Sequence, residues 1–230
     1  MSRALGSSAE RYVLKDFRGS SHRILARWIE ALPAGTRVLE LGPGLGHVAR
    51  LVDRRDLTWV GLEGSLSCLP GLRSALSASA ILDLEQLTRL PRGFDVVLAA
   101  DTLEHLAQPA RMLGLIHDCL APGGRLLASV PNVANLYVRL ALLAGRFPYA
   151  ERGILDRTHL HFFTRHSLGE MVAAAGFRRE RQAVSTIPLP LVWPRAPARL
   201  IGLLMSVLVA ATSVMPTVLG YQLIVSARRN

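Results

Sequence analysis

Four polar side chains with acid–base or charge chemistry lie close together in the chain: Asp156, Arg157, His159 and His161. They alternate with the apolar residues of the segment ILDRTHLHFF, at 154–163. Because buried polar groups without partners are costly, this density suggests an assembled site. We expect His159 to act as a general base, Asp156 to orient its imidazole and Arg157 to bind the substrate that accepts the transferred group. The alternative is a structural ion pair between Asp156 and Arg157, with His159 capping a turn.

A glycine-rich loop, ELGPGLG at 40–46, follows an apolar run and precedes a predicted helix over 47–53. Glycines let the backbone turn sharply beside a ligand, and a helix N-terminus presents unpaired N–H groups. The order is G-x-G-x-G, whereas a dinucleotide fingerprint requires a third glycine where His47 stands. The carboxylate of Glu40 disfavours a phosphate here and favours a cationic ligand, such as an ammonium or a sulfonium.

A second carboxylate, Glu63, ends the apolar run TWVGL and is followed by Gly64. A carboxylate at this place can accept hydrogen bonds from the two vicinal hydroxyls of a ribose. Every adenosine cofactor has these hydroxyls, so Glu63 does not by itself separate one such cofactor from another. The alternative is a solvated strand end.

Short apolar runs alternate with helical stretches, which indicates an α/β fold with a doubly wound sheet and helices on both faces. Strands are predicted over 37–41, 58–62, 79–82, 94–100, 125–130 and 221–227. Helices are predicted from Ser20–Ser21 to Glu30, from Pro109 to about Leu120, and from a Ser167 cap to Gly176. We expect one domain over 1–230, made of a core with an N-terminal extension (1–19), a substrate cap (131–166) and a proline-rich connector with an apolar helical insertion (187–220).

The composition excludes several classes of protein. The net charge is +10, but the basic residues are arginines apart from Lys15 and are scattered singly or in pairs, so we expect no nucleic-acid partner. Two cysteines, Cys68 and Cys119, are too few for a disulfide framework. The polar first residues lack the apolar core of a signal peptide, so we expect a cytoplasmic protein.

Five segments, in order and at normal spacing, resemble the class I S-adenosylmethionine-dependent methyltransferases. They are ELGPGLG, Glu63, ILDLEQL at 81–87, FDVVLAADTLEHL at 94–106 and LAPGGRLLASVPN at 120–132. The resemblance covers about residues 20–186. It implies a Rossmann-like sheet of seven strands with the last strand reversed. It also implies that S-adenosylmethionine lies over the carboxyl ends of the first strands and leaves as S-adenosylhomocysteine.

The resemblance further implies a cofactor site built from residues at or after the ends of the first four strands. They are Glu40, Gly42 and Gly44 for the methionine moiety, Glu63 for the ribose, Asp83 and the Leu84 backbone for the adenine amino edge, and Ala100 beside the methyl donor. For Asp83 the alternative is a helix N-cap.

The segment GILDRTHLHFFT at 153–164 closely resembles a methyltransferase subgroup that shares G-I-L-D-R-T-H-L-x-F-F-T and is often associated with polysaccharide or other secondary biosynthesis. Methyl transfer from a sulfonium is an in-line displacement, and a neutral hydroxyl acceptor must also lose its proton. We therefore expect two groups of site residues: His159, Asp156 and His105 in catalysis, and Arg157, His161 and Asn132 in acceptor binding.

Asp101, Glu104 and His105 are spaced i, i+3 and i+4, so they share one face if this segment is helical. The set resembles the ubiquinone-pathway O-methyltransferases, in which acidic residues and a histidine at these positions are associated with a divalent metal. Here Asp101 stands in place of their first glutamate. The D-x-L-E-H string also occurs in relatives in which no metal is implied. We therefore assign no metal ligand, and a structural role stays open.

The chain has no charged residue between Arg199 and Arg228. That length suggests a membrane span, but Pro216 interrupts the stretch and residues 221–227 match the expected last strand. We predict a helix over 198–214, inserted between the last two strands. It is apolar nearly all round, so it should be covered by the cap, by a second copy in a homodimer, or by a bilayer that Trp193 and the flanking arginines contact.

We therefore predict S-adenosylmethionine-dependent O-methylation of a small, glycan or lipid-linked acceptor, by a cytoplasmic enzyme located, in one alternative, at the inner face of the membrane. Two other functions stay open. One is a metal-assisted O-methyltransferase of the ubiquinone type. The other is a protein that binds the cofactor and a partner without turnover.

Overall fold

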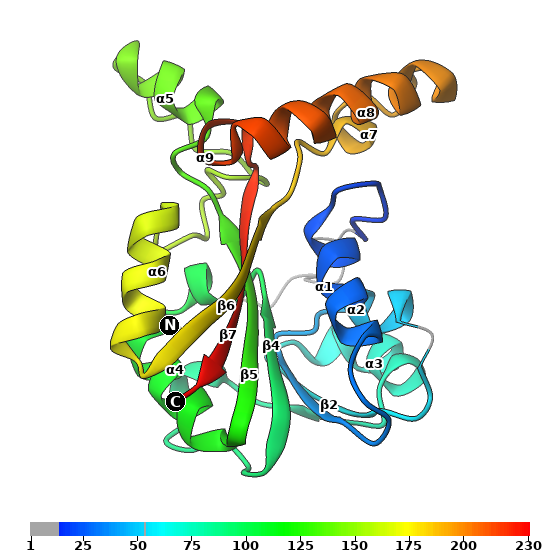
Figure 1. The fold of residues 1–230 in the computed structure, drawn as a ribbon, viewed down its shortest axis with the longest axis vertical. Coiled ribbons are helices and arrows are strands. Elements are labelled where there is room, and N and C mark those ends of the chain that lie inside the picture. Colours follow the sequence, from blue (N-terminus) through cyan, green and yellow to red (C-terminus); the bar gives the residue numbers. More distant parts are fainter. Residues whose placement is uncertain (1–13, 53) are drawn as a thin grey trace.

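The computed structural model describes residues 14–52 and 54–230. Seven strands form one sheet in the order β3-β2-β1-β4-β5-β7-β6 (Figure 1). The strands are β1 (Arg37–Leu41), β2 (Thr58–Glu63), β3 (Ala78–Ile81), β4 (Phe94–Ala100), β5 (Leu120–Pro131), β6 (Phe177–Val184) and β7 (Gln222–Arg229). The first five pair in parallel, and β7 is antiparallel to both of its neighbours. The predicted seven-stranded sheet with a reversed last strand is confirmed.

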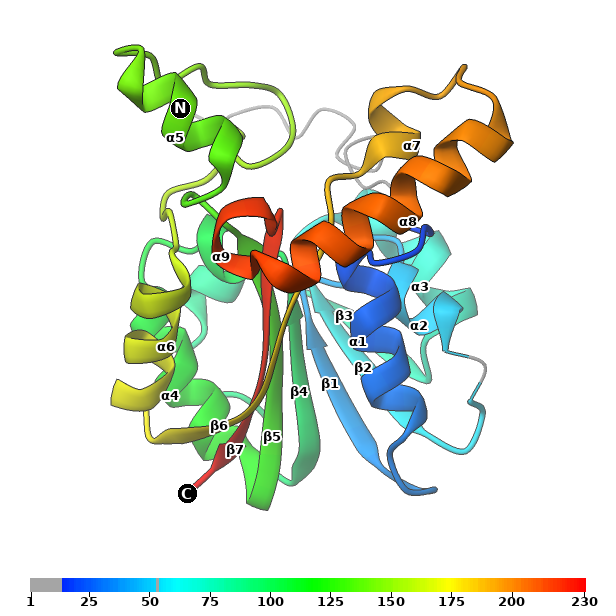
Figure 2. The same cartoon turned by 45° about the horizontal axis from the view of Figure 1, so that its top comes forward.

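Helices cover both faces of this sheet (Figures 1 and 2). One face carries α1 (Ser21–Glu30), α2 (His47–Leu51) and α3 (Leu69–Ala75), and the other carries α4 (Pro109–Cys119) and α6 (Arg165–Ala174). Alternate residues of each strand enter the two cores. In β4, Val97 packs with the α4 and α6 side chains, whereas Val96 and Leu98 pack with those of α1 and α2. Because successive side chains of a strand point to opposite faces, this alternation decides which helix layer each side chain packs against.

Helix α6 begins three residues earlier than predicted, because its cap is a different residue. Thr164, not Ser167, is the N-cap, and each residue's side-chain oxygen accepts a hydrogen bond from the other's backbone N–H. This reciprocal capping box uses both hydroxyls. Either one can be taken for the cap when only the sequence is considered.

The last part of the chain forms the predicted insertion between β6 and β7. It contains α7 (Leu189–Val192), α8 (Ala198–Val214) and α9 (Pro216–Leu219). The predicted helix over 198–214 coincides with α8. The proline-rich connector also contains the short helix α7, because Pro190 is tolerated in the first turn of a helix, where no intrahelical N–H donor is needed. None of the helices in the described ranges is both long and apolar enough to cross a membrane.

The predicted cap lies between β5 and α6 and contains α5 (Leu136–Leu143). It has a small core of its own, in which Val138 packs with Ile154 and Leu155. The backbone carbonyl of Glu104 accepts hydrogen bonds from Leu160 N at 2.8 Å and His161 N at 3.2 Å. These bonds fasten the segment after α5 to the loop that follows β4. The cap and the strand ends therefore meet at one place.

Candidate active site

The glycine loop between β1 and α2 has the backbone geometry that its sequence predicts. Gly42, Gly44 and Gly46 have φ of 66°, 56° and 73°, a left-handed region that favours glycine. A Cβ on Gly42 would lie 3.1 Å from the Thr102 hydroxyl, and a Cβ on Gly46 would lie 2.7 Å from that of Ala75. Gly42 and Gly46 thus lie too close to their neighbours for a side chain, and such close backbone approach is also what a ligand site requires.

Glu40 is buried beneath this loop and already has a partner. The indole Nε1 of Trp59 donates a hydrogen bond to its Oε2 over 2.8 Å. The pKa of Glu40 is raised to about 8, mainly by burial; the Trp59 hydrogen bond opposes this shift, and the nearby Glu63 carboxylate adds to it. Glu40 is therefore mostly protonated at neutral pH. Its expected contact with a cationic methionine moiety stays a prediction that requires loss of this proton on binding.

Glu63 is also buried, at the carboxyl end of β2, and lies across the glycine loop. Its Oε2 accepts a hydrogen bond from Gly44 N at 2.8 Å, and its Oε1 accepts one from Ser65 N at 2.9 Å. Each carboxylate oxygen has a second lone pair for a ribose hydroxyl. The residues thus fit an adenosine cofactor: a carboxylate reaches from the end of β2 to a close-packed glycine loop.

The other expected cofactor residues lie at the ends of β3 and β4. Asp83 caps the short 3₁₀ turn Leu84–Gln86, since its Oδ1 accepts a hydrogen bond from Glu85 N at 2.9 Å. Its carboxylate is exposed, and Leu84 is buried beside it. Ala100 is the last residue of β4. Capping and adenine binding are compatible, because Oδ2 of Asp83 is not used by the cap.

Asp101, which follows β4, is held by residues far away in the sequence. Its carboxylate pairs with the ammonium of Lys15 and accepts hydrogen bonds from Ser129 Oγ at 2.7 Å and Gln222 Nε2 at 2.5 Å. Burial raises its pKa, but the charges of Lys15 and His22 and the hydrogen bonds outweigh this and lower the pKa below its ordinary value. Asp101 is therefore a firmly ionised structural carboxylate.

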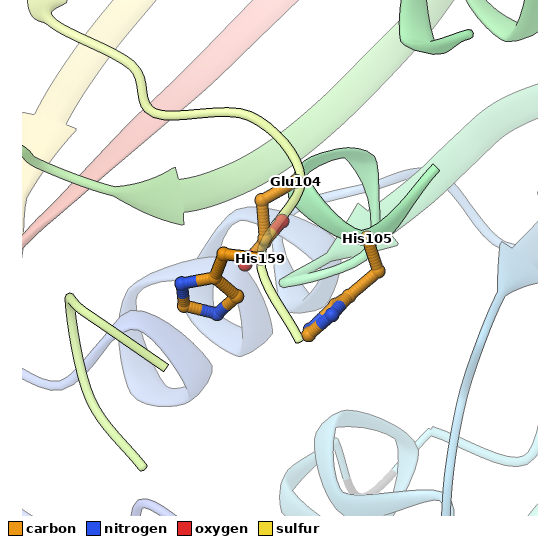
Figure 3. A group of neighbouring side chains, drawn as sticks. All are labelled: Glu104, His105 and His159. Carbon is orange, nitrogen blue, oxygen red and sulfur yellow. The ribbon is translucent and has the colours of Figure 1, made fainter. Parts of the chain in front are cut away.

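Three side chains converge where the cap meets the 3₁₀ turn Leu103–His105. The ligand atoms of Glu104, His105 and His159 lie within 4.8 Å of one another, and the two imidazoles flank the carboxyl group (Figure 3). Asp101 is not part of this group. The face that a helix would have given it with Glu104 and His105 does not form, because the chain turns through a positive φ of 55° at Asp101 and only Leu103–His105 forms a 3₁₀ turn.

Glu104 is fully buried, and neither carboxyl oxygen has a hydrogen-bond partner within residues 14–52 and 54–230. Burial, and then the charge of Asp101, raises the pKa of Glu104 well above its ordinary value. A buried polar group without a partner costs free energy, so this one indicates a function. Either a proton or a cation must neutralise the carboxylate.

The imidazole of His159 has a defined tautomer. Its Nδ1 lies 3.0 Å from the carbonyl oxygen of Ile154, which can only accept, so Nδ1 carries the proton and Nε2 keeps its lone pair. Burial, and then the neighbouring His105, lowers the pKa of His159. The His105 Nδ1 likewise lies 3.2 Å from the carbonyl oxygen of Thr158. His159 is thus a buried, neutral base near the end of β4.

Asp156 does not orient His159, contrary to the prediction. Its Oδ1 accepts hydrogen bonds from Thr158 N at 2.8 Å and Thr158 Oγ1 at 2.7 Å, so it closes the turn that carries His159. The backbone carbonyl of Ile154 holds the imidazole instead. The predicted alternative ion pair also differs, because Arg157 contacts Glu151 at 3.3 Å on the exposed surface.

The residues expected to bind the acceptor differ in burial and in how many of their polar atoms already have a partner. Asn132 is fully buried, and its amide donates to the carbonyls of Thr217 at 3.0 Å and Gly220 at 2.8 Å, while its Oδ1 accepts from Ala134 N. All its polar atoms are engaged, so it fastens β5 to the insertion and cannot also bind an acceptor. The His161 Nε2 faces the carbonyl of Ala107 at 3.2 Å.

Two site residues are missed by the sequence patterns: Lys15 and Gln222. Both contact Asp101, from segments at opposite ends of the chain. Lys15 is the only lysine in the sequence, which is the one signal that could have drawn attention to it. Gln222 opens the last strand and carries no such signal.

Residues 11–182 of this chain match the family described as a methyltransferase domain. The chain is 31% identical over 165 residues to the ubiquinone biosynthesis O-methyltransferase of Aeromonas salmonicida (strain A449), covering 67% of this chain and 68% of that protein. An S-adenosylmethionine-dependent methyltransferase from Mesorhizobium loti has a similar fold, with a TM-score of 0.60, 20% identity, and coverage of 92% and 99%. Magnesium protoporphyrin IX methyltransferase from Synechocystis PCC 6803, solved with bound S-adenosylhomocysteine, has a TM-score of 0.63, 14% identity, and coverage of 91% and 82%.

Proposed function

This chain belongs to the methyltransferase-domain family and is an S-adenosylmethionine-dependent methyltransferase, and we propose that it methylates a hydroxyl group whose proton His159 removes. One observation carries the proposal: the lone pair of His159 Nε2 is left unprotonated by the Ile154 contact, in a buried position beside the strand ends. A fixed neutral imidazole within reach of an acceptor is suited to general-base catalysis.

The bound cofactor supplies an electrophilic methyl group on a sulfonium, and the residues of the chain do the remaining work. The loop at 42–46 would hold the methionine end of the cofactor, and Glu63 would hold its ribose. The cap closes over the ends of the strands, where it can exclude water and align the acceptor oxygen with the methyl group. His159 then takes the hydroxyl proton on Nε2, and the Ile154 carbonyl stabilises the resulting imidazolium through Nδ1.

We propose a small acceptor, either a glycan or a molecule carried on a lipid. Two observations support this class. The Aeromonas relative is named for the biosynthesis of ubiquinone, which is a lipid. The helices beside the cap, α5 and α8, expose large apolar side chains at the same end of the molecule as the site.

The test is a methyl-transfer assay with the purified full-length chain and methyl-labelled S-adenosylmethionine. The acceptor panel contains a catechol, a polyprenyl-linked catechol and a nucleotide-linked hexose. We expect label in a methyl ether, which survives mild base, on at least one of them. Label on nitrogen or carbon, or in a base-labile ester, would contradict hydroxyl methylation.

A metal-assisted reaction is a second candidate, favoured by the orphaned carboxylate of Glu104. Glu104, His105 and His159 offer one carboxylate oxygen and two imidazole nitrogens, a donor set that suits a divalent transition metal. Such an ion would neutralise Glu104 and lower the pKa of an acceptor hydroxyl bound to it. Because it would occupy His159 Nε2, His159 could not then be the base.

Titration with Zn²⁺, Mn²⁺ and Mg²⁺ separates the two candidates. General-base catalysis predicts full turnover after dialysis against a chelator and no saturable metal binding. The metal-assisted reaction predicts binding of one ion, its loss in Glu104→Gln, and restoration of turnover when the metal is returned.

A further inference from the structure

The exposed apolar side chains of this protein are concentrated at one end. Among the described residues, fourteen of the sixteen large exposed hydrophobic side chains lie within 136–149 and 191–215. The first segment contains α5, and the second contains the end of α7 and all of α8. We call these two segments the apolar end. So strong a concentration is typical of an interaction surface rather than of scattered surface residues.

The apolar end projects from the edge of the sheet that carries the active site. Its segments follow β5 and β6, which are both antiparallel to β7 and therefore end at the same edge. Figures 1 and 2 show α5 and α8 extending to either side of the molecule beyond these strand ends. Whatever binds the apolar end therefore lies next to the site where methyl transfer takes place.

Each of the two longer helices presents a one-sided apolar stripe. On α8, Leu203, Val207 and Val214 are 64%, 59% and 81% exposed, at spacings that bring them to one face, while Met205 and Thr212 are buried. On α5, Leu136, Leu140 and Leu143 are spaced in the same way and exposed, and Val138 is buried. A helix that buries one side and exposes the other as an apolar stripe is suited to lie in the plane of a membrane interface.

The charges of the apolar end have one sign. Residues 136–149 and 191–215 contain no aspartate or glutamate and four arginines, all exposed: Arg139, Arg146, Arg195 and Arg199. Half-exposed Trp193 and Tyr137 accompany them, and these two residue types prefer the boundary between lipid headgroups and acyl chains. A surface that combines apolar, aromatic and only cationic groups is complementary to an anionic bilayer.

We propose that the apolar end binds the surface of an anionic lipid bilayer, with α5 and α8 lying in the interface and the active site facing the lipid. A second copy of the chain is a poorer occupant, because a symmetric contact would bring arginines against arginines without any acidic partner. The 17 residues of α8 rise about 25 Å, less than the hydrocarbon core of a bilayer, so the helix lies on the membrane.

The surface also has a hollow that suits a lipid. A cavity of about 490 Å³ lies between the N-terminal segment and the insertion, lined by Phe17, Trp193, Ile201, Met205 and Arg18 among others. Its walls are mostly apolar, with a guanidinium among them. One acyl chain beside an anionic headgroup matches this lining.

Co-sedimentation with vesicles tests the proposal on the full-length chain. The vesicles are phosphatidylcholine alone, and phosphatidylcholine with 30% phosphatidylglycerol (about one anionic lipid in three, enough for a negative surface potential). We expect partitioning onto the anionic vesicles, weaker at high salt, and little onto the neutral ones. No acceptor is needed, so the outcome does not depend on whether the hydroxyl assignment is right.

Two variants and a matched control locate the contact. Arg195→Ala with Arg199→Ala should lower the partition coefficient about 30-fold, from two lost arginine contacts. Leu203→Ser with Val207→Ser should lower it by a similar factor and do so at every salt concentration. The control, Arg89→Ala with Arg92→Ala, removes the same charge before β4, at the opposite edge of the sheet, and should lower it by far less. Retained binding of S-adenosylhomocysteine shows that each variant is folded.

Equal partitioning of all variants, or no preference for anionic vesicles, would overturn the proposal. So would a concentration-dependent dimer, seen by analytical ultracentrifugation without lipid, that Leu203→Ser with Val207→Ser dissociates. That result would assign the apolar end to a second copy of the chain.

Discussion

The indole Nε1–H of Trp59 donates a hydrogen bond of 2.8 Å to the carboxyl group of Glu40. Both side chains are buried beneath the glycine loop. The two residues come from neighbouring strands, β1 and β2, and both are at most 5% exposed. Burial dominates the contact and raises the pKa of Glu40 to about 8. A proton is thus stored beneath the loop expected to bind the cofactor.

The first prediction concerns the pH dependence of stability. Glu40 ionises near pH 4.5 in the unfolded chain but near pH 8 in the folded one, so the free energy of unfolding falls as pH rises between these values. Glu40→Gln keeps an acceptor for Trp59 and has no proton to lose. Relative to this variant, the wild type should lose up to about 1.4 kcal/mol per pH unit across that window and level off above pH 8.

Urea unfolding at pH 5, 6, 7, 8 and 8.5 measures this difference directly, and other titrating groups cancel between the two proteins. A constant difference from pH 5 to pH 8 would mean that Glu40 is already ionised in the folded protein.

The second prediction concerns His159. His159→Ala should lower kcat by about 10²-fold or more and leave the affinity for S-adenosylhomocysteine within a factor of about two. The matched control is His166→Ala, seven residues further along the chain, whose exposed imidazole lies 3.1 Å from the Glu170 carboxylate. We expect its kcat to stay within a few-fold of the wild type. Equal losses in the two variants would indicate damage to the cap rather than removal of a base.

The third prediction concerns Asn132, which the structure assigns to stability. Asn132→Ala leaves the buried carbonyls of Thr217 and Gly220 short of a donor, which costs about 1–3 kcal/mol. We expect Tm to fall by about 3–9 °C, with the KM for the acceptor unchanged. Calorimetry and steady-state kinetics check the two parts. A raised KM with an unchanged Tm would restore the acceptor-binding role.

The fourth prediction concerns the ion pair between Lys15 and Asp101. Lys15→Met leaves a partly buried carboxylate with two hydrogen bonds but no counter-charge, and Asp101→Asn leaves a partly buried ammonium. Each single change should destabilise the protein more than the two together, because removing one partner of such a pair exposes the cost of the other. Urea unfolding of all four proteins gives the coupling energy. Additive losses would mean that the pair contributes little.

The sequence was sufficient for the parts of the fold that depend on local pattern. Apolar runs and glycine positions predicted the strands, and the stretch without charges between Arg199 and Pro216 predicted α8. The boundary of α6 could not be decided, because Thr164 and Ser167 stand three residues apart and each hydroxyl can cap.

The site was harder to predict, because its key contacts involve backbone carbonyls or distant segments. The partner of His159 is the carbonyl of Ile154, and carbonyl directions are set by the turn and not by residue type. Asn132 reaches carbonyls 85 and 88 residues further along the chain. A sequence motif shows which polar side chains are present, whereas only the fold shows which of them already have hydrogen-bond partners within the protein.

The hairpin between β6 and β7 is closed by the bonds of Tyr221 N to Ser185 O at 2.8 Å and Ser185 N to Gln222 O at 3.0 Å. These bonds lie where the insertion leaves β6 and returns to β7. The pairing of the two strands is therefore closed without any contact from the helices of the insertion. We therefore expect that the insertion can be lengthened, recharged or replaced up to the end of α8 without loss of methyl transfer, provided that the Thr217 and Gly220 carbonyls that Asn132 holds are kept.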